Sequence, residues 1–86
     1  MGKHQKLLWT LLRGRSDSNI RFADLQALLV DLGFVERISG GHHIYRREGV
    51  RELINLQRDG SKAKAYQVRQ IRKVLLRYGL GELPDD

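Results

Sequence analysis

The fold is decided by Gly40-Gly41-His42-His43-Ile44-Tyr45, a glycine pair followed at once by two histidines. A Gly-Gly pair is typical of a tight hairpin connection, because glycine adopts positive φ without steric cost. The segment before it, residues 34–39, is β-rich and roughly alternating, and residues 42–47 read as the returning strand. We therefore predict a β-hairpin with both histidines at the start of its second strand.

A third strand is predicted at residues 52–57, after a second turn that pivots on Gly49. Three short strands joined by tight turns form an antiparallel meander, which usually buries one face and exposes the other. Ile54 and Leu56 share a face of the third strand. Residues 58–61 are predicted to be a loop.

Helices are predicted before and after this meander in the chain, at residues 5–13, 22–32 and 65–78. Each carries one apolar stripe at helical spacing and ends at a glycine, namely Gly14, Gly33 or Gly79. The order α-α-β-β-β-α predicts an α+β sandwich with the helices on one face of a three-stranded antiparallel sheet. The stripe residues are Leu7, Leu8, Leu11 and Leu12; Phe22, Leu25, Leu28, Leu29 and Leu32; and Val68, Ile71, Val74, Leu75 and Tyr78.

The chain length indicates a single domain over residues 1–86, with frayed ends at 1–4 and 81–86. No cysteine is present, and the two adjacent histidines cannot easily share one ion, so we expect no metal and no cofactor. The apolar runs are too short to span a bilayer, and the first residues lack the apolar core of a signal peptide. We therefore expect a cytoplasmic protein without membrane association.

Positive charge is concentrated near the C-terminal end. The net charge is +6, and residues 61–79 contain six basic residues and no acidic one. A segment of one sign is typical of a phosphate-binding surface. It is equally typical of a solvated helix face or of a patch that pairs with an acidic protein.

The two histidines are the candidate chemical groups. An unperturbed imidazole has a pKa of about 6.5, and as a general base it typically contributes about 10²–10⁴-fold to a rate. RNA carries its own nucleophile, the 2′-hydroxyl, so a base, nearby cations and a proton donor suffice to cleave it. Because neighbouring strand residues face opposite sides, His42 and His43 are not expected to act on one atom. A plain hairpin turn and a surface histidine remain the alternatives at this point.

Gly40 and Gly41 would let a polymer backbone approach closely and would leave amide N–H groups facing an anion. Lys62 and Lys64 stand just before the last helix, where unpaired amides and the helix dipole favour phosphate. The alternative is a pair of solvated loop lysines.

Taken together, these residues resemble the HicA family of bacterial toxins, the mRNA interferases of type II toxin–antitoxin pairs. The resemblance runs from about residue 6 to residue 80, and the Gly-Gly-His-His-Ile-Tyr turn followed by the basic helix is its most specific part. The chain departs from many relatives in having Gly41 in place of serine, and Arg58 and Ala65 in place of proline. The matching segments are residues 12–17, 19–20, 32–34, 40–45, 52–57, 60–64, 66–70 and 75–80.

The resemblance implies a fold like the double-stranded-RNA-binding domain (dsRBD), here with an additional N-terminal helix. It implies a metal-independent endoribonuclease that cleaves mRNA, with His42 as the functional histidine, and a HicB-type antitoxin that blocks it. His42 is then the expected catalytic base, and the RNA-binding residues are expected to be Gly40, Gly41, Lys62, Lys64, Arg69 and Lys73. The rival interpretations are a non-catalytic RNA-binding module of the same fold and a basic protein whose partner is an acidic protein.

Overall fold

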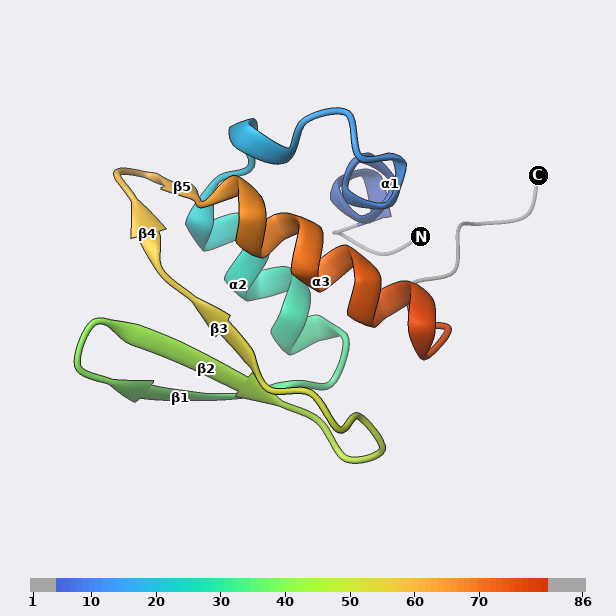
Figure 1. Cartoon of the computed structure of the whole chain (residues 1–86), viewed down its shortest axis with the longest axis vertical. Helices are drawn as coiled ribbons and strands as arrows, with labels where there is room; N and C mark the ends of the chain where they lie inside the picture. The colour runs from blue at the N-terminus through green and yellow to red at the C-terminus, as the bar shows by residue number, and fades with distance from the viewer. Residues whose placement is uncertain (1–4, 81–86) are drawn as a thin grey trace.

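The computed structural model describes residues 5–80, so the expected frayed ends at 1–4 and 81–86 lie outside the described residues. Within that range the chain is a small α+β domain with three α-helices and a three-stranded antiparallel sheet (Figure 1). The elements are α1 (Gln5–Arg13), the 3-10 turn η1 (Asp17–Asn19), α2 (Phe22–Asp31), β1 (Val35–Ser39), β2 (His42–Arg46), β3 (Ile54–Leu56), β4 (Arg58–Asp59), β5 (Lys62–Ala63) and α3 (Ala65–Arg77).

The predicted β1–β2 hairpin is confirmed, and its register follows from its turn. Ser39 pairs with His42 across Gly40 and Gly41, and the sheet order is β1-β2-β3. Gly40 has φ +60°, whereas Gly41 is outside the left-handed region. A two-residue turn with positive φ only at its first central residue is the type II′ pattern, which matches the twist of the flanking strands.

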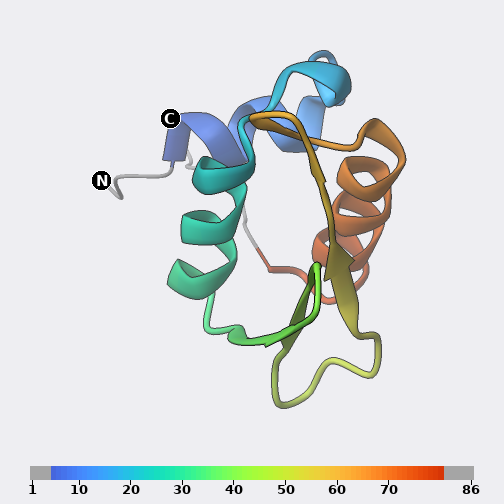
Figure 2. The ribbon, with the colours of Figure 1, turned by 90° about the vertical axis from the view of Figure 1, so that its left-hand side faces the viewer.

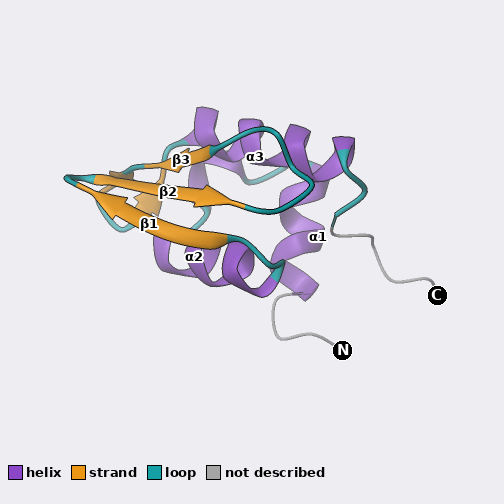
Figure 3. Ribbon diagram, turned by 90° about the horizontal axis from the view of Figure 1, so that it is seen from below, coloured by secondary structure: helices purple, strands orange, loops and turns teal. Residues whose placement is uncertain are grey.

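All three helices lie on one side of the β1-β2-β3 sheet (Figures 1 and 3). α2 and α3 cover the sheet, and α1 lies beyond them on the side away from it (Figure 2). Seen from below, the strands lie in front of the helices, and no described element covers their outer face (Figure 3). The fold therefore has one open sheet face, as the element order predicts.

The core forms where the apolar stripes of the helices meet the inner sheet face. Every predicted stripe residue is buried or packs against the core. Ile54 and Leu56 enter the same core from β3, as predicted, and Phe34 closes the end of α2 by donating its N–H to the Leu29 carbonyl at 3.0 Å. The fully buried large side chains are Leu11, Phe22, Leu25, Leu28, Leu29, Tyr45, Ile54, Leu56, Val68, Ile71 and Leu75.

Residues 58–61 correct the predicted element order, because they are not a plain loop. β4 and β5 form a second hairpin across Gly60 and Ser61. This hairpin is held by the segment before α2: Phe22 N–H donates to the Ser61 carbonyl and Ala63 N–H to the Ile20 carbonyl, both at 2.9 Å. These partners are about forty residues apart, so no local pattern could indicate the pairing. β3 is also shorter than predicted, covering Ile54–Leu56 rather than residues 52–57.

The last helix begins at Ala65, so the absence of proline there does not displace its first turn. Among the described residues no helix is long and apolar enough to cross a membrane.

Candidate nucleic-acid interface

The two histidines lie on opposite faces of the sheet, as the alternation of β2 predicts. His43 pairs with Ile38 and Leu56, and its side chain lies on the inner face towards α2. His42 is exposed on the outer face. The register and the turn therefore separate the two imidazoles.

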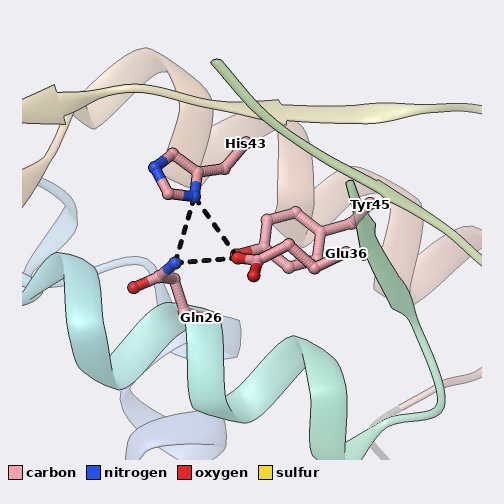
Figure 4. Close-up of polar contacts among 4 residues, drawn as sticks. All are labelled: Gln26, Glu36, His43 and Tyr45. Atoms are coloured by element: carbon pink, nitrogen blue, oxygen red, sulfur yellow. Dashed lines mark hydrogen bonds and ion pairs between the residues drawn. The ribbon is translucent and has the colours of Figure 1, made fainter. Parts of the chain in front are cut away.

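His43 belongs to a polar cluster that joins the sheet to α2 (Figure 4). Its Nδ1 lies 3.3 Å from Glu36 Oε2 and 3.2 Å from Gln26 Nε2, and its ring meets the Phe22 ring edge-on at 5.0 Å. Gln26 also donates to Glu36 Oε2 at 2.8 Å, and the buried Tyr45 hydroxyl donates to the same oxygen. His43 is thus a packed and hydrogen-bonded residue.

The donors around Glu36 stabilise its ionised form. The Tyr45 hydroxyl is the largest contributor that lowers the pKa of Glu36, followed by Gln26 and His43. Burial and the neighbouring carboxylate raise the pKa of Tyr45, so its hydroxyl stays a donor throughout the physiological range. The cluster is therefore a carboxylate held by three donors from three side chains.

His42 takes part in a separate group on the outer face. Its Nδ1 lies 3.3 Å from Asn55 Oδ1, and Gln57 Nε2 lies 3.3 Å from both of its ring nitrogens. Lys64 Nζ donates to Gln57 Oε1 at 3.4 Å. The structure thus brings together two residues chosen from the sequence, His42 and Lys64, through a glutamine that the sequence analysis did not single out.

The amide side chains of Asn55 and Gln57 flank the His42 ring. Lys64 can only donate, so the Gln57 atom that faces it is the amide oxygen, and the amide nitrogen faces His42. Nδ1 of the ring lies 3.3 Å from both Asn55 Oδ1 and Gln57 Nε2, so it can donate to the first or accept from the second. The two side chains therefore contact the ring in either neutral tautomer.

The rest of the outer face is cationic. Arg37 of β1 and Arg46 of β2 are exposed there, and no carboxylate side chain stands on this face of the three strands. Neither arginine stands out in the sequence as a site residue, because the face on which each lies depends on the strand register. The residues of the three strands on this face are Val35, Arg37, Ser39, His42, Ile44, Arg46 and Asn55.

The basic residues of α3 do not all serve one surface. Arg72 makes a bidentate ion pair with Asp17, at 2.7 and 3.1 Å, and Arg77 pairs with Glu52 at 2.8 Å. The hydrogen bond to Asp17 raises the pKa of Arg72, and the one to Glu52 raises that of Arg77. Both arginines are therefore committed to holding elements together.

Lys62, Arg69 and Lys73 are exposed and form no ion pair with any other residue between 5 and 80. Lys62 lies on β5, two residues before Lys64, and its backbone pairs with Asp59 and Arg21. Arg69 and Lys73 lie on the solvent side of α3, and no contact joins them to His42. The structure therefore brings together His42 and Lys64, whereas no contact joins Lys62, Arg69 or Lys73 to His42.

The turn at Gly40 and Gly41 is open. A Cβ atom at either glycine would meet nothing within 4 Å, so the requirement for glycine at Gly40 is its positive φ and not close packing. A serine at position 41 would therefore fit without a clash.

The candidate site could have been found in part from the sequence. Asn55 and Gln57 alternate with the inward Ile54 and Leu56, so the period of two residues is the signal that places them on the other face. Their meeting with His42 needed the β2–β3 register, and the irregular chain between Arg47 and Leu53 hides it. Among residues 5–80 no group of three or more His, Cys, Asp or Glu side chains could hold a metal ion.

Comparison with models of protein families, with curated proteins and with solved structures finds no match to this chain. The class that the fold and the outer face define is therefore a small α+β domain with an open, cationic sheet face that carries one histidine.

Proposed function

We propose that this protein is a metal-independent endoribonuclease of the HicA kind, the toxin of a type II toxin–antitoxin pair, built on a dsRBD-like fold. One observation carries the proposal: the His42 imidazole is exposed on the open sheet face, where the side chains of Asn55 and Gln57 contact it at 3.3 Å. The cations around that face are those that a phosphate backbone needs.

In the proposed reaction, His42 Nε2 takes the proton of a ribose 2′-hydroxyl. The 2′-oxygen then attacks the adjacent phosphorus, the bond from phosphorus to the 5′-oxygen breaks, and that oxygen takes up a proton. The products are a 2′,3′-cyclic phosphate and a 5′-hydroxyl end. Asn55 would stabilise the imidazolium by accepting from Nδ1, the role that a buried carboxylate has in hydrolase triads.

Lys64 and Lys62 would bind the phosphate next to the attacked bond, with Arg69 and Lys73 holding the chain farther along. Gly40 and Gly41 would admit the backbone beside His42. A HicB-type antitoxin would then inhibit the enzyme by covering the outer face, and His42 with it.

The decisive experiment is cleavage of a labelled single-stranded RNA in excess chelator. We expect the parent to cleave and His42→Ala to lose about 10²–10⁴-fold in rate, the usual contribution of a general base, while keeping its affinity for RNA. His4→Ala is the matched control, because it also removes a histidine but one without a role in the proposed site. The 2′,3′-cyclic phosphate end is identified by its mass.

Three results would contradict the proposal. Cleavage by His42→Ala at the parental rate would exclude His42 as the base. Binding of RNA by the parent without cleavage would instead make the protein a non-catalytic RNA-binding module of this fold. Absence of RNA binding by the parent would favour the interpretation that this is a basic protein whose partner is an acidic protein.

A further inference from the structure

Tyr66 is an exposed aromatic side chain that the proposed reaction does not use. It lies in the first turn of α3 with 54% of its surface accessible. Two other aromatic rings of the described chain carry a guanidinium group over their faces: Arg13 lies 4.3 Å from the Trp9 centroid, and Arg58 lies 4.5 Å from that of Phe22. No described cation stacks on Tyr66, so its faces are open to a ligand.

The ring is tied to the His42 group by hydrogen bonds. Gln67 is buried, and its amide nitrogen donates to the Tyr66 hydroxyl at 3.5 Å. The amide oxygen of Gln67 accepts the backbone N–H of Gln57 at 2.8 Å, and the side chain of Gln57 contacts His42. Tyr66 therefore stands at the same end of α3 as the candidate base, joined to it through two glutamines.

Cations lie on both sides of the ring along the chain. Lys64 precedes Tyr66 by two residues, and Arg69 follows it by three, which places Arg69 on the same side of the helix one turn on. An exposed aromatic ring between phosphate-binding cations is the arrangement with which proteins hold single-stranded nucleic acids, since each base has a face that can stack.

We infer that Tyr66 is a stacking platform for an unpaired nucleobase of the nucleotide next to the phosphate that Lys64 binds. The inference rests on the proposed function, because it assumes that RNA lies across the His42 face. It adds a base-binding subsite that tolerates different bases and that a paired base in a duplex could not enter.

The test is a double-mutant cycle between protein and RNA, measured by binding and not by cleavage. Every protein carries His42→Ala, so that the RNA stays intact. Fluorescence anisotropy gives the Kd for a short single strand and for a series in which one nucleotide at a time is abasic. We expect Tyr66→Ala to weaken binding of the intact strand roughly 5- to 150-fold, as loss of one stacked base does. We expect no further loss from Tyr66→Ala when the base missing from the RNA is the one that stacks.

Matched variants separate stacking from folding and from charge. Tyr66→Phe keeps the ring and should bind as tightly as the protein that carries His42→Ala alone. Tyr66→Leu keeps apolar bulk and should bind as weakly as Tyr66→Ala. Leu76→Ala truncates another exposed apolar residue of α3 and should leave the Kd unchanged. Urea unfolding of each variant verifies that it folds.

The inference is overturned if Tyr66→Ala leaves the Kd unchanged, or if its effect is equal for every abasic strand and for a duplex of the same sequence. Either result would leave the proposed function standing if the parent still cleaves RNA. Failure of the proposed function shows separately, as an absence of RNA binding and cleavage by the protein with both Tyr66 and His42 intact.

Discussion

At the scale of single residues, Glu36 helps to determine on which face of the sheet His42 and His43 lie. Its carboxylate holds His43 on the inner face, together with Gln26 and Tyr45. Because strand side chains alternate, anchoring His43 inward places His42 on the open face. A polar cluster that contacts no ligand thus contributes to the position of the candidate base.

Glu36 also predicts how stability depends on pH. Its pKa lies below the ordinary 4.5 in the folded protein, chiefly because the Tyr45 hydroxyl donates to it. A lowered pKa means that the unfolded chain binds the proton more tightly, so this stabilisation is present above about pH 4.5 and is lost as the pH falls through the lower folded value. Glu36→Gln should therefore be less stable than the parent at pH 7.

The measurement is urea unfolding of both proteins from neutral pH to pH 3. We expect the difference in unfolding free energy to shrink as the pH falls, because the parent loses its carboxylate and the variant has none to lose. A difference that stays constant over this range would show that the charge of Glu36 has no part in it.

At the scale of elements, two arginines bind α3 to the rest of the fold, one near the middle of the helix and one at its C-terminal end. Arg72 reaches the Leu11 carbonyl at 3.3 Å and both oxygens of Asp17, so it joins α3 to the end of α1 and to η1. Gly14 makes room for this contact, since a Cβ there would lie 3.0 Å from Arg72 Nη1 and its φ is +71°. Arg77 reaches Glu52 near the far end of the helix, but its side chain is 70% exposed.

Arg72→Lys should lower the free energy of unfolding by about 1–3 kcal/mol, because lysine keeps the charge but cannot make the bidentate contact with Asp17. Its side chain is only 19% exposed, so solvent does not replace the lost bonds freely. Arg77→Lys is the matched control at an exposed pair and should have a much smaller effect. Chemical denaturation measures both, and equal effects would contradict this assignment.

At the scale of the whole molecule, charge is distributed by face. α1 lies on the side of the helices away from the sheet (Figure 1). Lys64 instead contacts Gln57, whose side chain contacts His42. If RNA binds where we propose, Lys62 and Lys64 should release counterions from the RNA phosphates, and the basic residues of α1 should not. Salt dependence of binding therefore reports which face meets the nucleic acid.

Neutralising Lys62 and Lys64 together with glutamine should reduce the slope of log K against log salt concentration by about 1.4, at about 0.7 for each phosphate contact to a single strand. Lys6→Gln with Arg13→Gln removes the same charge from α1 and should leave the slope unchanged. Binding titrations at several salt concentrations give both slopes. If Lys6→Gln with Arg13→Gln reduces the slope by the same amount, net charge alone, and not this face, drives binding.

Much of the fold could be predicted because its signals are local. The apolar stripes of α1, α2 and α3 repeat every three to four residues, and the Gly40-Gly41 turn sets the β1–β2 register by itself. These features depend on residues a few positions apart, so a pattern in the chain is sufficient to show them. His42 and His43 lie on opposite faces because side chains alternate along a strand with a period of two residues.

The β4–β5 hairpin and the site could not be read in this way. Residues 61–63 pair with residues 20–22, and Asn55 and Gln57 meet His42 only through the β2–β3 register. The charge pattern of α3 likewise did not reveal that Arg72 and Arg77 are bound to carboxylates of other elements. The sequence by itself determined the helices, the first hairpin and the candidate base. Only the tertiary structure decided which cations remain exposed and which amides orient the imidazole, because those contacts join residues that are distant in the chain.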